Sequence, residues 1–225
     1  MEKRNLIVFE GIDGSGKSTQ FNMLRERFDR ESRDFRRLRY PRYDKPSSAL
    51  IKMYLNGELG DNPGMINAYA ASSFYAVDRY ASYMQDWRKY YESGGLILTD
   101  RYTTSNAIHQ GAKLSGTEQN DFLTWLYNYE FDLLGLPRPD LVVYLDISAD
   151  VAERRLRNRK RKPGISRDIH EEDVEYLKKC SLLGKYAADF YNWHSVDCVK
   201  DGKELNENEL HEAVYDIVLN HLTQK

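Results

Sequence analysis

A glycine-rich segment close to the N-terminus combines residue types that together bind phosphate. Residues 11–18 read Gly-Ile-Asp-Gly-Ser-Gly-Lys-Ser and match the pattern G-x-x-x-x-G-K-[ST] in full. In this pattern the glycines let successive backbone N–H groups turn inward around phosphate oxygens. The lysine adds a cation near the β- and γ-phosphates, and the final hydroxyl can bind Mg²⁺. We therefore expect a nucleoside triphosphate here, bound by Gly11, Asp13, Gly14, Ser15, Gly16, Lys17, Ser18 and Thr19.

A second pair of residues suited to phosphate chemistry follows an apolar run further along the chain. Leu96–Thr99 predicts a strand, and Asp100 and Arg101 come directly after it. A carboxylate at the end of a strand can hold Mg²⁺, so Asp100 and Ser18 are the predicted metal ligands. An arginine beside it can hold a phosphate group. This pairing suits an enzyme that binds two anionic substrates at once.

Sequence features of other proteins with the same phosphate-binding loop are missing from this chain. The N-K-x-D motif, with which a regulatory GTPase reads its base, does not occur. Asp100 is followed by Arg101, and not by the second carboxylate with which a motor ATPase activates water. These features favour a small-molecule kinase.

A strongly basic stretch lies in the second half of the chain. Seven of the nine residues from Arg154 to Lys162 are basic, and Pro163-Gly164 follows them. The stretch could be a solvated basic face, a patch for nucleic acid, or a mobile lid over bound phosphates. A net charge of −2 and the lack of interleaved aromatic residues disfavour nucleic acid. A loop of arginines between two helices, about residues 154–168, is what a closing lid requires.

Short apolar runs that alternate with longer periodic ones predict the elements that must position these residues. Strands are expected at Leu6–Glu10, Arg36–Tyr40, Leu96–Thr99, Leu141–Ile147 and Val196–Lys200. Helices are expected at Lys17–Phe28, from Ile66 to the Ser93-Gly94-Gly95 stop, from about Asp168, and at Glu207–Leu222. Alternating strands and helices predict an α/β fold with a central parallel sheet and helices on both faces. Ligands then bind at the carboxyl ends of the strands.

Composition limits the broad class of protein. The chain has 225 residues, 41% of them hydrophobic and 30% charged, and we expect one domain over residues 1–225. The apolar run at Leu6–Phe9 is too short for a signal peptide, and Leu141–Leu145 is far too short to span a membrane. Two cysteines without metal-like spacing are typical of a reducing compartment. We expect a cytoplasmic protein that binds neither membranes nor nucleic acid.

Five segments together resemble the thymidylate kinase family. They are FEGIDGSGKSTQ, YPRY, SFYAVDRY, TDRYTTSNAIHQGAK and LPRPDLVVYLDIS, and the resemblance covers about residues 5–185. It implies the fold of the P-loop nucleoside-monophosphate kinases with an arginine-rich lid, and a homodimer. It also implies transfer of the γ-phosphoryl group of ATP to dTMP in the presence of Mg²⁺.

The resemblance implies roles for the positions that match. Asp13 would meet the 3′-hydroxyl region of dTMP, and Arg101 would grip its phosphate. Tyr75 would stack on thymine and Arg79 would read a thymine carbonyl. Because Tyr75 and Arg79 are four residues apart, one helix face can present both to the same base.

The remaining acceptor positions come from two further segments. Ser105 and Asn106 would line the base and bond its edge, and Gln110 would help to frame the pocket. His109 stands where the family usually has tyrosine under the sugar, which leaves the strength of selection against a 2′-hydroxyl open. Arg42 is a candidate second arginine for the dTMP phosphate, although the family often places that arginine one residue later.

The resemblance also bears on the catalytic cations. Some members carry a catalytic arginine inside the P-loop, where this chain has only Gly14 and Ser15. Members of the other type supply it from the lid. The predicted catalytic residues are therefore Lys17, Arg101 and the lid candidates Arg159, Arg161 and Arg167.

Two alternatives remain at this stage. One is a kinase for another nucleoside monophosphate or for a deoxynucleoside, and the other is a non-catalytic nucleotide-binding protein of the same fold. Arg101 beside Asp100 argues against an uncharged nucleoside acceptor. The intact Lys17 and Ser18 argue against a non-catalytic member.

Overall fold

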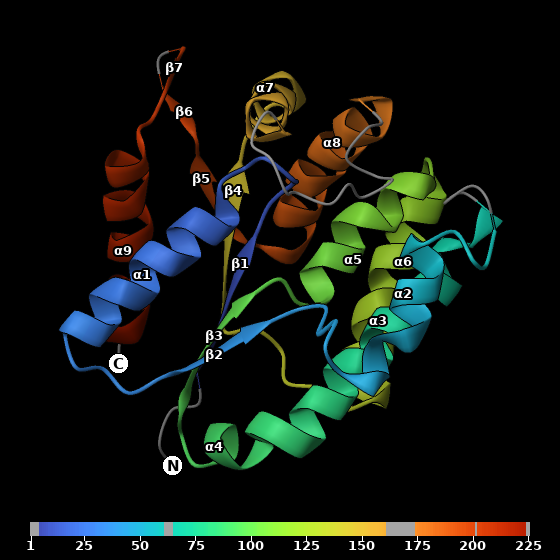
Figure 1. Ribbon diagram of the computed structural model, residues 1–225, viewed down its shortest axis with the longest axis horizontal. Helices are drawn as coiled ribbons and strands as arrows, with labels where there is room; N and C mark the ends of the chain where they lie inside the picture. Colours follow the sequence, from blue (N-terminus) through green and yellow to red (C-terminus); the bar gives the residue numbers. More distant parts are fainter. Residues whose placement is uncertain (1–4, 61–64, 161–173, 201, 224–225) are drawn as a thin grey trace.

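A computed structural model describes residues 5–60, 65–160, 174–200 and 202–223, with the side chains of residues 159 and 160 excepted. Its centre is a five-stranded parallel sheet in the order β2-β3-β1-β4-β5 (Figure 1). The strands are β1 (Asn5–Glu10), β2 (Arg36–Arg39), β3 (Leu96–Asp100), β4 (Leu141–Asp146) and β5 (His194–Asp197). The predicted α/β class and parallel sheet are confirmed.

The middle strand of the sheet, β1, is buried on both faces, as is usual for parallel sheets. Leu6, Ile7 and Val8 of β1 have no exposed surface, since helices cover both faces of the sheet. Val8 lies opposite Thr99 of β3 on one side and Val142 of β4 on the other. The register brings the carboxyl ends of β1 and β3 to the same edge.

Two helix layers enclose the sheet (Figure 1). Helices α1 (Lys17–Arg30) and α9 (Glu207–Thr223) pack against each other on one side. Helices α5 (Thr103–His109) and α8 (Val174–Tyr191) pack together on the other, with α6 (Thr117–Tyr127) and α3 (Ala68–Ser82) beyond them. In α1 the buried residues include Phe21, Leu24 and Phe28, a helical spacing that turns one apolar stripe to the core.

The long helix predicted from Ile66 is present with one irregularity. It consists of α3, a π-helical turn η3 (Tyr83–Trp87) and α4 (Arg88–Glu92). The Asn67 side chain caps its start by accepting a hydrogen bond from the backbone N–H of Ala70 at 2.8 Å. The glycine pair 94–95 ends it as predicted, because Gly94 has a positive φ of 93° that favours glycine.

The last predicted strand differs from the structure. Residues 196–200 were expected to form one strand, but β5 ends at Asp197, and β6 (Val199–Lys200) pairs antiparallel with β7 (Lys203–Glu204) in a separate hairpin. The chain leaves the sheet at Cys198, whose N–H donates to the carbonyl of Asp146 at 2.9 Å. The pattern of apolar and polar residues over 196–200 does not show that one strand ends and another begins there.

The remaining described elements connect these layers. They are η1 (Pro46–Ser48), α2 (Ala49–Leu55), η4 (Gly111–Lys113), the π-helical η5 (Asn128–Leu133) and α7 (Ala149–Lys160). The helix start expected near residues 168–171 lies outside the described residues. In the described part of the chain, no helix has the length and apolar character needed to cross a membrane.

Candidate active site

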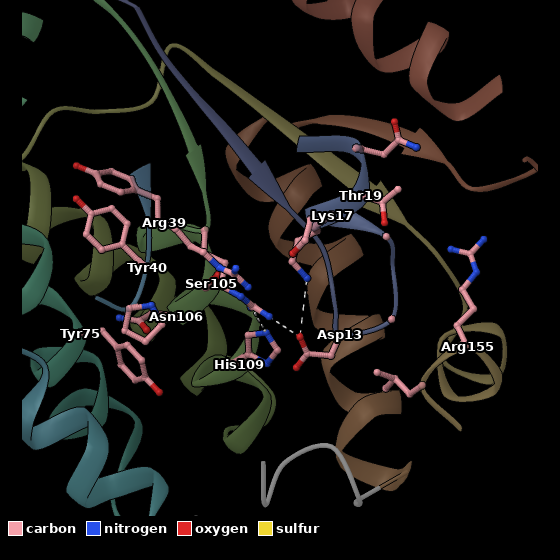
Figure 2. Close-up of a pocket in the computed structure, with 18 of the residues that line it drawn as sticks. Asp13, Lys17, Thr19, Arg39, Tyr40, Tyr75, Ser105, Asn106, His109 and Arg155 are labelled. Atoms are coloured by element: carbon pink, nitrogen blue, oxygen red, sulfur yellow. Dashed lines mark hydrogen bonds and ion pairs between the residues drawn. The ribbon is translucent and has the colours of Figure 1, made fainter. Parts of the chain in front are cut away.

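A cleft of about 1290 Å³ opens where β1, β2 and β3 end (Figure 2). The predicted site residues that line it are Asp13, Gly14, Gly16, Lys17, Ser18, Thr19, Arg42, Tyr75, Arg79, Arg101, Ser105, Asn106, His109 and Gln110. Gly11, Ser15 and Asp100 are buried beside it. The Arg159 side chain is not described, and Arg161 and Arg167 lie outside the described residues.

The P-loop has the backbone that the sequence pattern predicts. Gly14 and Gly16 have φ values of 84° and 94°, and a Cβ on Gly14 would come within 2.6 Å of the carbonyl oxygen of Ala152. Glycine at residue 14 is therefore required both by conformation and by close packing against α7. Helix α1 starts at Lys17, so its positive N-terminal end faces the loop.

The ammonium group of Lys17 is held inside the loop. Its Nζ donates to the carbonyl oxygen of Ile12 at 3.0 Å and lies 3.9 Å from Oδ1 of Asp13. Lys17 is 5% exposed. Burial, reinforced by the nearby charge of Arg101, lowers the pKa of Lys17 to about 8, although Asp13 partly opposes the shift.

The Arg101 side chain pairs with the same carboxylate oxygen of Asp13 as Lys17. Its Nη2 forms an ion pair with Asp13, while Nη1 lies 3.1 Å from Nε2 of His109 and 3.4 Å from Oγ of Ser105 (Figure 2). Burial by itself would raise the pKa of Asp13. The charges of Arg101 and Lys17 outweigh that effect and hold the pKa well below its usual range. One carboxylate oxygen thus pairs with two cations, one at the start of α1 and one directly after β3.

A hydroxyl and a carboxylate meet beside these cations. Oγ of Ser18 donates to Oδ2 of Asp100 at 3.0 Å. Oδ1 of Asp100 is buried and has no hydrogen-bond partner within the described residues. Nε of Arg39 lies 3.6 Å from Oδ2 of Asp100. The structure therefore brings the two predicted metal ligands together.

The other end of the cleft holds the residues expected to bind a base. Tyr75 and Asn106 lie close to each other there (Figure 2). Nδ2 of Asn106 donates to the carbonyl of Ser72 at 3.2 Å, which ties α5 to α3. Gln110 is 2% exposed, and its Oε1 has no partner among the described residues.

Arg79 lies at the same end in a buried ion pair. Its Nε and Nη2 donate to the two carboxylate oxygens of Glu130 at 2.7 and 2.5 Å, and Nη1 donates to the carbonyl of Tyr102 at 3.3 Å. Burial opposes the charged form of Arg79, yet the charge of Glu130 raises its pKa. The pair fixes the orientation of the guanidinium and uses three of its five N–H donors.

Arg42 is engaged elsewhere in the structure. It pairs with Asp78 through Nε at 3.1 Å, with Asp86 through Nη1, and with Oγ of Ser47 through Nη2 at 3.0 Å. These acidic partners take up most of the donors of its guanidinium. The structure does not place Arg42 in the Asp13–Arg101 cluster.

Sequence reasoning missed two arginines that line the cleft. Arg39 ends β2 with a 74% exposed side chain beside Asp100, and Arg155 of α7 donates from Nη1 to the carbonyl of Ser15 at 3.2 Å. The expectation that site residues follow strands could have identified Arg39. Arg155 was counted with the lid, but it lies on a helix that packs against the P-loop.

A buried glutamate that sequence reasoning also missed links the two ends of the cleft. Oε1 of Glu10 accepts from the N–H of Gly11 at 2.9 Å. Its Oε2 accepts from Oγ1 of Thr104 at 2.7 Å and from Oγ of Ser105 at 2.6 Å. Glu10 has no exposed surface. It therefore anchors the start of the P-loop to the first turn of α5.

Comparisons with known proteins identify relatives of this chain. The family model for thymidylate kinase matches residues 9–209. The thymidylate kinase of Mycobacterium tuberculosis is 36% identical over 180 residues, which are 79% of this chain and 83% of that protein. The probable thymidylate kinase 1 of Saccharolobus solfataricus is 29% identical over 208 residues, which are 92% of this chain and 95% of that protein.

A solved structure has the same fold. The thymidylate kinase of Candida albicans aligns with a TM-score of 0.69 and 21% identity, over 97% of this chain and 94% of that one. Together with the family match over most of the sequence, these findings give one conclusion: the chain belongs to the thymidylate kinase family.

Proposed function

We propose that this protein transfers the γ-phosphoryl group of ATP to the phosphate of dTMP and releases ADP and dTDP. The observation that carries the proposal is the placement of Lys17 and Arg101 at the same carboxylate oxygen of Asp13 in one cleft. Lys17 belongs to a loop that binds a triphosphate, and Arg101 follows a neighbouring strand. A triphosphate held by Lys17 and a monophosphate held by Arg101 would therefore be neighbours in the cleft.

The acceptor half of the reaction uses Arg101 and its neighbours. The phosphate of dTMP replaces part of the pairing between Arg101 and Asp13, and Ser105 lies within reach of the same group. Asp13 is then available to the sugar hydroxyl. The acceptor oxygen is already ionised, so the reaction needs positioning more than a strong general base.

The donor half uses the P-loop. Lys17 lies where charge accumulates on the γ-phosphoryl oxygens as the bond to ADP breaks. Arg159, Arg161 and Arg167 are the proposed sources of a further cation, because the P-loop offers only Gly14 and Ser15 near that position.

The last residue of β3 and the first turn of α1 together offer oxygen atoms that fit Mg²⁺. Asp100 and Ser18 supply a carboxylate and a hydroxyl oxygen, the donors that Mg²⁺ prefers, and Oδ1 of Asp100 is buried without a partner in the described part of the chain. When bound, Mg²⁺ neutralises charge on the β- and γ-phosphates. The chain itself contributes the orientation of these two oxygens by their 3.0 Å hydrogen bond.

The base end of the cleft suits a pyrimidine with a carbonyl at position 4. Arg79 keeps N–H donors beyond those bound by Glu130 and Tyr102, while Tyr75 offers a face for stacking. Arg42 is not part of this proposal, since its guanidinium is bound by Asp78, Asp86 and Ser47.

We also propose a homodimer in the cytoplasm, formed through α3 and η3. Val77 and Tyr80 of α3 and Met84 of η3 are 49%, 40% and 45% exposed and are spaced three and four residues apart, so they lie on one side of the continuous helix. Light scattering should give about twice the chain mass of 26.4 kDa. Val77→Glu should shift it toward the monomer.

A coupled ADP-release assay tests the reaction itself. It compares dTMP with dUMP, dCMP, dGMP, AMP and thymidine at a fixed ATP concentration. We expect the highest kcat/KM with dTMP and no turnover with thymidine, which lacks the phosphate that Arg101 would hold. A preference for thymidine or for a purine monophosphate would contradict the proposal.

A further inference from the structure

The contact between Arg101 and His109 fixes the protonation state of the histidine. Nη1 of Arg101 lies 3.1 Å from Nε2 of His109. A guanidinium has donors only and keeps its charge at any working pH, so Nε2 must accept the hydrogen bond. The imidazole is then neutral and carries its proton on Nδ1. Nδ1 lies 3.6 Å from Sγ of Cys180, a weak acceptor on α8.

Residues of α8 contact both the backbone and the ring of His109. The hydroxyl of Tyr176 on α8 donates to the backbone carbonyl of His109 at 2.8 Å, and the two rings lie 6.4 Å apart. Cys180 is fully buried on the same helix. Helix α8 thus fixes the end of α5 that carries His109.

The groups of other elements that face His109 are the cleft residues already described. Arg101 after β3 and Lys17 on α1 are cations, and Asp13 in the P-loop is the anion that pairs with both. Tyr75 of α3 lines the same cleft. A proton added to His109 would therefore bring a third positive charge beside Arg101, with two donors facing each other at 3.1 Å.

We propose that His109, in its neutral form protonated on Nδ1, is a positioning residue that holds the Arg101 guanidinium for the phosphate of dTMP. His109 binds Nη1 and Asp13 binds Nη2, so the plane of the guanidinium is set at two points. The proposal rests on the proposed role of Arg101 as the dTMP-phosphate ligand. It goes beyond the contact with the sugar that the family resemblance implies at residue 109.

The proposal makes dTMP binding, more than chemistry, depend on the protonation of His109. Protonation removes the acceptor at Nε2 and repels the guanidinium, so the KM for dTMP should rise as the pH falls. The second ionisation of the dTMP phosphate, near pH 6, acts in the same direction. The variant His109→Gln separates the two effects, because glutamine keeps a hydrogen-bond acceptor for Arg101 but does not titrate. The ionisation of dTMP is the same in assays of wild type and variant.

Steady-state kinetics on wild type, His109→Gln, His109→Phe and His194→Gln from pH 8.5 to 5.5 provide the test. This range spans the ordinary titration of imidazole. At pH 8.5 we expect His109→Phe to raise the KM for dTMP about tenfold with a smaller change in kcat, because a hydrogen bond to a charged group is lost. His109→Gln should raise KM only about threefold, since its Oε1 can accept from Arg101. His194 is exposed on β5 and is not among the described residues that line the cleft, so His194→Gln should match wild type.

The pH profile carries the decisive comparison. Between pH 8.5 and 5.5 the KM of wild type should rise several-fold more than the KM of His109→Gln. A wild-type profile parallel to that of His109→Gln, or a KM that falls relative to it at low pH, would overturn the proposal. An unchanged KM in His109→Phe would do the same.

Nitrogen NMR of the imidazole rings separates this proposal from the proposed function. In the free protein at pH 8, the resonances assigned through His109→Gln should show a proton on Nδ1. A proton on Nε2 would contradict the geometry whatever the substrate is. If the tautomer is as expected but Arg101→Ala leaves the KM for dTMP unchanged, the role of Arg101 is wrong, and the positioning role fails with it.

Discussion

Two of the arginine–carboxylate pairs in the cleft differ in exposure. Arg101 and Asp13 have side chains that are 24% and 29% exposed, at the phosphate end. Arg79 and Glu130 have side chains that are 2% and 0% exposed, at the base end. A pair that water reaches can exchange its carboxylate for a substrate phosphate, whereas breaking a buried pair leaves a charge without a partner. We infer that the first pair is a binding site and the second a support for one.

The largest expected effect belongs to the phosphate end. Lys17→Ala should lower kcat by about 10³-fold or more, because the cation beside the γ-phosphoryl group is lost. The coupled ADP-release assay measures it, and a thermal melt close to wild type shows that the fold is kept. Lys178→Ala, which removes an exposed lysine of α8, is the matched control. A variant with more than about a tenth of wild-type kcat would contradict the role of Lys17.

The next prediction compares how much each pair contributes to the free energy of unfolding of the protein. Glu130→Ala should lower the free energy of unfolding by about 3–5 kcal/mol, because Arg79 is left buried and unpaired. Asp13→Ala should change it by about 1 kcal/mol or less, since that pair is partly solvated. Urea denaturation of both variants gives the two values.

A double variant identifies the cause of the loss. Arg79→Met combined with Glu130→Leu removes both charges and should recover much of the stability that Glu130→Ala loses. If the double variant is as unstable as the single one, lost packing and not the unpaired charge explains the effect. Equal losses in Glu130→Ala and Asp13→Ala would remove the distinction between the two pairs.

The selectivity for the base of the acceptor tests whether Arg79, held by Glu130, contacts that base. Arg79 should favour a carbonyl at the pyrimidine 4-position and reject the amino group of dCMP, because two donors would then face each other. We expect kcat/KM for dTMP to exceed that for dCMP by about 10²-fold. Comparable values for the two nucleotides would show that Arg79 does not read the base.

The smallest expected effect is a pH dependence at the phosphate end. The pKa of Lys17 is lowered to about 8, so the free enzyme loses this cation as the pH rises through that value. The kcat/KM for ATP should therefore fall above about pH 8, approaching tenfold per pH unit. Bound ATP stabilises the charged lysine, so kcat/KM for dTMP at saturating ATP should fall much less. A flat profile for ATP up to pH 9.5 would contradict the shift.

The sequence by itself determined the parts of this protein that depend on neighbours along the chain. The spacing of glycines, Lys17 and Ser18 specifies the P-loop, and short extended runs located the first four strands of the sheet, whereas the fifth was placed two residues late and joined to β6. The order of motifs then indicated the family, which the comparisons confirm. These features are local because turn geometry and side-chain periodicity follow from a few adjacent residues.

The tertiary structure decided which charges meet. Glu130 lies 51 residues from Arg79, and Asp78 lies 36 residues from Arg42, so neither pairing can be read from local spacing. One arginine is thereby held at the base end, and the other is bound by acidic residues outside the cluster at Asp13. The contact of His109 with Arg101 likewise needs the end of α5 to be fixed by α8. Any carboxylate in the sequence could form an ion pair with a given arginine. The tertiary fold determines which of them lies within contact distance.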